Sequence, residues 1–283
     1  MKTSLYDFVP AQIISIRQES KKTNTYSLRV EEPIDFAIGQ FIIVNMPSIG
    51  QFPVMGHPIS KSGDILEITL SKDNELEKIF CIQKHISDTI MIRGGYGNAL
   101  DISSMKDKNL LFIASNSGII NIKPIFYGLL QDRDNYQKID INYSSCNYDE
   151  LIYKEEHSHW QAIDDTQLTI SLEKPKKDWS GYKGNILDLL LKNQLKLKNT
   201  IAFISVESRL SSSIMEYLLA QNFDKKNIFI VLLEDINCGV GKCSKCNIGP
   251  YLKCKDGPIM NYSDIERFLL SHKKMKNIES AYV

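Results

Sequence analysis

Four cysteines in one short segment constrain this chain more than any other feature of its sequence. They are Cys238, Cys243, Cys246 and Cys254, and their spacing is C-x4-C-x2-C-x7-C. A C-x4-C-x2-C opening followed by a more distant cysteine is the plant-type spacing of a 2Fe-2S cluster. Two glycines between the first two cysteines permit the positive backbone dihedrals that a chain wrapping round a cluster needs. The spacing therefore predicts a 2Fe-2S site on these four thiolates.

Two other uses of these cysteines remain open. Structural zinc sites usually bring together two short Cys-x2-Cys or Cys-x2-His knuckles, and only Cys243 to Cys246 has that form here. A disulfide framework needs oxidising conditions, which nothing in the sequence supports. The remaining cysteines stand apart: Cys81 lies in an apolar run, where we expect a buried core residue, and Cys146 has no ligand partner nearby in the sequence.

Composition excludes several classes of partner. The chain has 283 residues, 43% of them hydrophobic, which suffices for two domains and an appendage. Lysine plus arginine and aspartate plus glutamate number 34 each, so there is no basic excess of the kind that binds nucleic acid. No apolar run reaches the length of about eighteen residues that a membrane-spanning helix needs. The first residues lack the apolar stretch of a secretory signal, and we expect a cytoplasmic protein.

Residues 1–103 have the pattern of a small antiparallel β-barrel. Short β-type runs are separated by turn residues, and a helical pattern interrupts them only near residues 76–85. The runs are 11–17, 25–30, 40–46, 65–71 and 89–93. Two segments are candidate functional sites. One is His57, Pro58, Ile59 and Ser60, and the other is the glycine-rich turn 93–98, whose backbone can approach a phosphate or a planar ring. Two ordinary hairpin turns are the alternative.

Residues 104–233 alternate strands and helices, which predicts a doubly wound parallel sheet with helices on both faces. The predicted strands are 109–115, 139–144, 166–172, 200–206 and 227–233, and the predicted helices are 120–130, 149–156, 185–192 and 210–221. Ligands of such sheets bind at the carboxyl ends of the strands. Gly118, in the first strand-to-helix turn, is therefore a candidate nucleotide contact. Residues 234–283 form a third part, the cysteine segment and a tail.

A barrel, a doubly wound domain and a C-terminal cysteine segment together resemble the ferredoxin-NADP reductase family over roughly residues 5–265. The resemblance is strongest in CGVGKCSKCNIGPYLKCKDGPIM, which is similar to the electron-transfer subunits of anaerobic sulfite reductase and sulfhydrogenase. Dihydroorotate dehydrogenase has a related electron-transfer subunit. Segment 38–41, IGQF, is similar to the family's barrel strand, and segment 93–98 resembles its RGPYGN turn with Gly95 in place of proline.

The resemblance implies FAD in a cleft between barrel and sheet, electrons from NAD(P)H, and transfer to the 2Fe-2S cluster. It places Pro58, Ile59 and Ser60 against the flavin, with His57 where the family has an arginine or a small residue. Gly97 and Asn98 would end the FAD-binding domain. The chain would then be an oxidoreductase subunit of the NAD(P)H-dependent flavoprotein reductase type.

Three nucleotide motifs depart from the family. Its GxVT helix start resembles segment 74–77, NELE; its GGxGxxP loop resembles 115–121, SNSGIIN; and its CGPP turn resembles 205–208, SVES. A carboxylate at Glu77 replaces a threonine where a helix start should attract an anion. These departures leave open a second interpretation, a non-enzymatic relay or docking subunit that has lost NAD(P) and possibly FAD.

Either interpretation needs a redox partner. We expect the cysteine-bearing end to associate with a catalytic subunit, such as one of the sulfite reductase or hydrogenase type. The histidines show no metal-ligand spacing, and segment 157–159, HSH, is expected to be a surface loop rather than a metal site.

Overall fold

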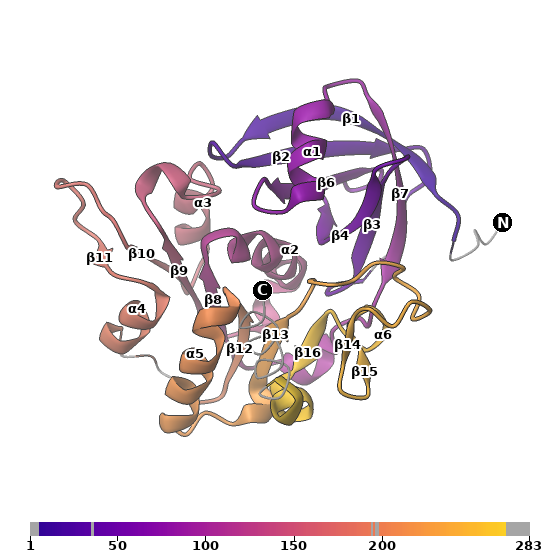
Figure 1. Cartoon of the computed structure of the whole chain (residues 1–283). Coiled ribbons are helices and arrows are strands. Elements are labelled where there is room, and N and C mark those ends of the chain that lie inside the picture. The colour runs from indigo at the N-terminus through magenta and orange to yellow at the C-terminus, as the bar shows by residue number, and fades with distance from the viewer. Residues whose placement is uncertain (1–5, 35–36, 194, 196–197, 270–283) are drawn as a thin grey trace, which may run out of the picture.

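The structure is a computed structural model that describes residues 6–34, 37–193, 195 and 198–269. It has two large sheets, and Figure 1 shows the antiparallel sheet at the top of the view and the second sheet with its helices below it. Among the described residues, no helix is long and apolar enough to cross a membrane. The tail beyond residue 269 lies outside the described residues.

The first sheet is seven-stranded and antiparallel, in the order β4-β3-β7-β1-β2-β6-β5. Its strands are β1 (Val9–Gln18), β2 (Thr23–Val30), β3 (Phe41–Met46), β4 (Gly50–Val54), β5 (Gly56–Pro58), β6 (Ile65–Ser71) and β7 (Thr89–Tyr96), with α1 (Glu75–Gln83) after β6. The two edge strands, β4 and β5, are separated in the chain by Met55 alone. The sheet must therefore roll until its edges meet, which gives the barrel-like shape that the sequence predicted.

The second sheet has the order β11-β10-β9-β8-β12-β13-β16, in which only β16 runs antiparallel to its neighbour. Its strands are β8 (Asn109–Ser115), β9 (Ile139–Ser145), β10 (Thr166–Leu172), β11 (Tyr182–Lys183), β12 (Thr200–Ser205), β13 (Ile228–Val231) and β16 (Ile259–Asn261). The chain builds outward from β8 on one side and then returns to β12 on the other. The switch point of this doubly wound sheet therefore lies between the carboxyl ends of β8 and β12.

Helices cover both faces of the second sheet, as predicted. They are α2 (Ile119–Leu130), α3 (His157–Gln161), α4 (Ile186–Lys192) and α5 (Ser208–Ala220). Along β8, Leu110, Phe112 and Ala114 join the core under α2 and α3, whereas Leu111 and Ile113 join the core under α4 and α5. Helix α2 also packs against barrel residues. It is apolar on nearly all sides because it is buried between the two sheets.

One predicted helix is wrong. Residues 149–156 form a 3-10 turn (Tyr148–Glu150) and an irregular segment, and the helix α3 begins only at His157. The Asn147 side chain accepts hydrogen bonds from the backbone N–H groups of Asp149 and Glu150, which favours a turn. Tyr153 then adopts a φ of 61°, which no α-helix accommodates.

The expected surface loop at residues 157–159 is also a helix. His157 Nε2 lies 3.0 Å from the Ile152 carbonyl oxygen, and Trp160 on the same helix is 1% exposed. Burial of the indole against the sheet stabilises this short turn of helix, which polarity alone did not predict.

The cysteine segment is a long connection between two neighbouring strands of the second sheet. It leaves β13 at Val231 and returns at Ile259, and these two residues pair in the antiparallel register of β13 and β16. Between them lie a small hairpin of β14 (Asn247–Ile248) and β15 (Tyr251–Leu252) and the short helix α6 (Lys253–Asp256). In Figure 1 this segment lies beside the barrel. The predicted boundaries near residues 103 and 233 stay predictions.

Candidate functional site

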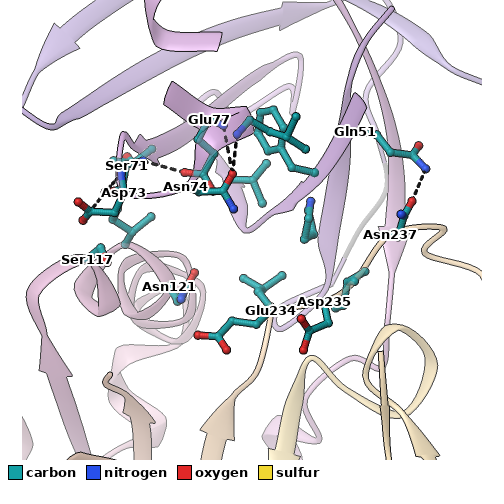
Figure 2. Close-up of a pocket in the computed structure, with 18 of the residues that line it drawn as sticks. Gln51, Ser71, Asp73, Asn74, Glu77, Ser117, Asn121, Glu234, Asp235 and Asn237 are labelled. Atoms are coloured by element: carbon teal, nitrogen blue, oxygen red, sulfur yellow. Dashed lines mark hydrogen bonds between the residues drawn. The ribbon is translucent and has the colours of Figure 1, made fainter. Parts of the chain in front are cut away.

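A cavity of about 760 Å³ opens between the barrel and the second sheet, beside the start of α2 (Figure 2). The barrel contributes β4, β6 and the start of α1, and the second domain contributes the start of α2. The floor is the segment that follows β13, residues 233–237, together with Lys245 from the cysteine segment. The cavity therefore joins all three parts of the chain.

One part of the cavity lining is apolar or neutral. Phe52, Pro53 and Val54 come from β4, and Leu76 and Ile120 add two aliphatic side chains. Neutral hydrogen-bonding groups stand among them: Gln51 Nε2 donates to Asn237 Oδ1 at 2.9 Å, and Figure 2 shows Asn121 on the helix in the left part of the view. Such a lining suits a planar ring with polar edges.

The α1 side of the cavity is acidic. The Asn74 side chain caps α1 by accepting from Leu76 N at 2.9 Å and from Glu77 N at 3.3 Å. Glu77 Oε2 accepts from Ser71 N at 2.8 Å. Burial, with a smaller contribution from the nearby Asp73 carboxylate, raises the pKa of Glu77 from 4.5 to about 7.

Acidic groups also stand on the floor of the cavity. Glu234 and Asp235 face Asn121 and the α1 side across the cavity in Figure 2. Asp235 Oδ2 is paired with Lys253 Nζ at 3.1 Å. Among the described residues that line the cavity, four are carboxylates and Lys245 is the only cation. The cavity thus presents negative charge on two opposite sides.

Glu77→Gln is expected to remove a pH-dependent loss of stability. Because the folded pKa of Glu77 lies above its ordinary value, the stabilising effect of its proton is fully present below pH 4.5 and is lost as pH rises through about 7. Between pH 5 and pH 8, the free energy of unfolding of the unchanged chain should fall by about 2.5 kcal/mol relative to the variant. Urea unfolding across this range measures the difference.

The matched control is Glu75→Gln, whose side chain is 83% exposed on the same helix turn. Its pH profile should follow that of the unchanged chain. If the stability of Glu77→Gln followed the same pH profile as that of the unchanged chain, Glu77 would be ionised throughout this range and the predicted shift would be wrong.

The switch point itself is closed by side chains. The Asn116 amide donates to Glu207 Oε1 and accepts from Cys146 N at 3.0 Å. Ser115 Oγ accepts from Glu207 N at 3.1 Å. Glu207 is also paired with Arg209 at 2.5 Å. A carboxylate held at the carboxyl ends of β8 and β12 repels the phosphate groups that such a crevice usually binds.

Gly118 fits this closed crevice for a steric reason. A Cβ at Gly118 would lie 1.9 Å from the Ser205 carbonyl oxygen, although its φ of −58° suits any residue. The glycine therefore lets the β8–α2 turn contact the end of β12. Its neighbours Ser117 and Asn121, rather than Gly118, line the cavity.

Gly118→Ala should destabilise the fold by about 1 to 3 kcal/mol, because backbone must move to accept the methyl group. Urea unfolding compares it with Ser117→Ala, which removes atoms at the adjacent position. Equal stability of the two variants would contradict the close contact with Ser205.

The cysteine segment arranges its thiols as two pairs. Cys238 is hydrogen-bonded to Cys243, and Cys246 is hydrogen-bonded to Cys254. Cys246 and Cys254 are buried, whereas Cys243 is exposed. Burial and the adjacent Cys246 raise the pKa of Cys254 to about 12. Burial would raise the pKa of Cys238 too, but backbone N–H groups, with those of Val240, Cys243 and Lys242 foremost, lower it to about 6.

The donor set of this segment fits a 2Fe-2S cluster. As the side chains stand, no three His, Cys, Asp or Glu residues in the described part of the chain are grouped to hold one metal ion. Two irons need two thiolates each, which two thiol pairs supply, whereas a tetrahedral zinc site needs all four at one point. The backbone N–H groups of Lys242 and Cys243 donate to Cys238 Sγ at 3.3 and 3.4 Å, as amides around cluster sulfurs do. All six cysteines are free of disulfides.

Close packing shapes the same segment. Gly239 and Gly241 have φ of 73° and 76°, as expected for a chain that wraps round its own thiols. A Cβ at Gly239 would lie 2.8 Å from Tyr96 on the barrel, and one at Gly241 would lie 2.5 Å from Lys255. The two glycines are therefore required by both conformation and space.

Three of the four barrel residues expected to contact a flavin line a different cavity from the one described above. His57, Pro58 and Ile59 line a second cavity of about 760 Å³ on another side of α2, beside Lys123. His57 stacks on Tyr127 with ring centroids 5.2 Å apart. Burial, and then the Lys123 charge, lower the pKa of His57 to about 4. The structure does not bring these residues together with Gly118.

Ser60, the fourth of these residues, forms a hydrogen bond within its own turn: its hydroxyl donates to Asp64 Oδ1 at 2.7 Å. Gly97 and Asn98 contact the cysteine segment. Asn98 N donates to the Gly257 carbonyl oxygen at 2.6 Å, and a Cβ at Gly97 would lie 2.3 Å from that oxygen. The glycine turn thus joins the barrel to the cysteine segment.

The predicted strands did not include the β4 residues that line the main cavity. This stretch has the pattern of a turn, because it contains Gly50, Pro53 and Gly56. In the structure, however, β4 is an edge strand paired with β3. A proline is tolerated on such an edge. The available signal was the alternation of buried Phe52 and Val54 with their less buried neighbours.

Comparisons with known proteins agree with this geometry. No family model matches the chain. The gamma subunits of sulfhydrogenase 1 and sulfhydrogenase 2 from Pyrococcus furiosus are 27% and 26% identical to it, over 82% and 84% of this chain and 82% and 88% of theirs. The chain resembles sulfhydrogenase gamma subunits. The predicted resemblance is therefore confirmed along most of the sequence.

Solved structures show the same fold. An NADH-dependent reduced ferredoxin-NADP oxidoreductase, studied for flavin-based electron bifurcation, superposes with a TM-score of 0.70 at 16% identity, covering 100% of this chain and 99% of its own. The CS-b5R domains of human Ncb5or superpose with a TM-score of 0.66 at 17% identity, covering 81% and 70%. The two-domain fold of ferredoxin-NADP reductases is thus confirmed.

The cavity fits only part of the dinucleotide FAD. Its volume and its apolar β4 wall suit the flavin ring, but the α1 end carries Glu77 and Asp73 where phosphates would need cations. The closed crevice at Glu207 fits the phosphates of NAD(P) no better. The chain therefore offers a ring site without a phosphate cradle.

Proposed function

We propose that this chain is an electron-transfer subunit of a multi-subunit redox complex, with a 2Fe-2S cluster on Cys238, Cys243, Cys246 and Cys254 and a flavin ring in the interdomain cavity. The single observation that carries this proposal is the shared wall of the two sites. Asn237 and Lys245 line the cavity, and each is the direct neighbour in sequence of a cysteine, Cys238 or Cys246.

A bound flavin ring would supply the exchange between two-electron donors and a one-electron cluster. The chain's own residues would hold and shield the ring. Phe52 and Val54 exclude water on one side, and the Gln51 to Asn237 hydrogen bond fixes the floor next to Cys238. Arg93 Nη2 donates to the Cys238 carbonyl oxygen at 3.1 Å and so ties the first cysteine to the barrel.

The surface near the cysteines favours a protein partner. Cys243 is exposed, and the lysines at 242, 245 and 255 beside the thiols are exposed as well. The gamma-subunit relatives belong to sulfhydrogenases by name, so we propose a hydrogenase-type catalytic subunit as the partner. A sulfite reductase-type subunit is the other expected partner of this arrangement.

Anaerobic purification of the full chain with its native partners tests the proposal. We expect about two irons and two acid-labile sulfides per chain, an extractable flavin, and a co-purifying redox subunit. Zinc without sulfide would contradict the cluster. Iron and sulfide without any flavin would instead support the second candidate function, a relay subunit, which the acidic lining at Glu77 and the closed crevice at Glu207 favour.

A further inference from the structure

We infer that the interdomain cavity selects a flavin without phosphate, riboflavin in preference to FMN or FAD, and that Glu77 is the residue that discriminates. This inference rests on the proposed function and names the ligand class of that same site. It follows from three features of the cavity: a blocked helix start, a buried carboxylate and an acidic floor.

Helix α1 of the barrel is nine residues long, and its first turn lines the cavity. Free N–H groups at a helix start bind phosphate. Here the Asn74 side chain already accepts from Leu76 N and Glu77 N. The first turn also carries Glu75 and Glu77, whose charges cancel the positive end of the helix dipole. Two N–H groups of this helix start are therefore already bonded, and its first turn does not offer a phosphate favourable charge.

Glu77 makes the exclusion specific. Its carboxylate lines the cavity and is held in place by Ser71 N at 2.8 Å, so it cannot swing out to solvent without losing that bond. Asp73 stands beside it, bonded to Ser71 Oγ at 3.0 Å. At pH 8, above the Glu77 pKa of about 7, the Glu77 carboxylate is charged. A phosphate here would meet two fixed negative charges in a partly buried space.

The floor gives a phosphate no better place. Glu234 lines the floor of the cavity, and the largely buried cation Lys253 is already paired with Asp235. Lys245, the remaining lining cation, is exposed and solvated. By contrast, the neutral hydroxyls of a ribityl chain find amide and hydroxyl partners in Asn121 and Ser117. The lining therefore accepts the ring and sugar alcohol and rejects the phosphate.

Flavin fluorescence quenching tests this inference on the cluster-containing chain, purified with its partner and freed of flavin, at pH 8. Dissociation constants are measured for riboflavin, FMN and FAD, which share one ring and differ in phosphate. We expect riboflavin to bind at least about tenfold more tightly than FAD, as one uncompensated charge repulsion requires. Glu77→Gln should tighten FAD binding by about tenfold and leave riboflavin binding unchanged, whereas Glu75→Gln should change neither.

Each outcome decides the inference. FAD binding as tightly as riboflavin to the unchanged chain, or a riboflavin-to-FAD ratio that Glu77→Gln leaves unaltered, would overturn it and still support the proposed flavin function. Binding of none of the three flavins would overturn both the inference and the flavin part of the proposed function. The cluster part is decided separately by iron and sulfide content.

Discussion

Cys254→Ser is expected to reduce bound iron from about two per chain to near zero and to abolish the visible absorbance of the cluster. Cys254 is 1% exposed and pairs with Cys246, so no other thiol can reach its place without rearranging the segment. Loss of one ligand leaves an iron with incomplete coordination, and the cluster then dissociates. Iron and acid-labile sulfide analysis after anaerobic reconstitution measures the effect.

The matched control for that loss is Cys146→Ser, a half-buried free thiol outside the cysteine segment. It should retain the iron and sulfide of the unchanged chain. If Cys254→Ser kept full iron and Cys146→Ser lost it, the assignment of the four ligands would be wrong. Retained metal without sulfide in the unchanged chain would point to zinc.

Lys123→Met is expected to destabilise the chain by about 3 to 5 kcal/mol, because it leaves a buried carboxylate without its partner. Lys123 on α2 bonds to Glu67 on the barrel, and the two side chains are 3% and 9% exposed. Its Nζ also lies 2.6 Å from Glu156 Oε1 in the second domain. Arg17 pairs with Glu156 at 2.9 Å and is 3.8 Å from Glu67, which leaves Glu67 with only a distant cation.

A double variant separates charge from packing in this cluster. Lys123→Met combined with Glu67→Gln removes both buried charges, and we expect it to recover a large part of the lost free energy of unfolding. Lys138→Met removes a surface lysine that is 42% exposed beside Asp140, and it should cost no more than about 1 kcal/mol. Urea unfolding measures all three. A double variant no more stable than the single one would show that Lys123 acts through packing alone.

The sequence predicted the parts of this fold that rest on local pattern. The strand at residues 109–115 was predicted with its observed bounds, because an unbroken apolar run such as Leu110 to Ala114 is typical of a buried strand. The cysteine spacing likewise needed no tertiary information. The helix at 149–156 failed because Asn147 forms a turn with the residues after it, and a side-chain bond of this kind competes with helix where propensity is weak.

The residues that line the candidate site were harder to predict, because they depend on which edge of the rolled barrel sheet each strand occupies. Residues 57–58 on β5 and 51–54 on β4 lie on consecutive edge strands that occupy opposite edges of one rolled sheet. Side chains only a few positions apart in the sequence therefore line different cavities. The sequence marks Glu77 as an unexpected carboxylate at a helix start. The structure adds that Glu77 lines the cavity and that Ser71 N holds its side chain in place.

The position of the cysteine segment between β13 and β16 bears on how such chains change over evolutionary time. Val231 and Ile259 pair across the two strands, so the sheet itself brings both ends of the segment together. A stretch anchored in this way can be exchanged for a shorter, longer or differently spaced one while both anchor points stay fixed. The redox group would then behave as a replaceable cassette, and a transplant of residues 232–258 onto another reductase sheet would be the natural engineering use of this architecture.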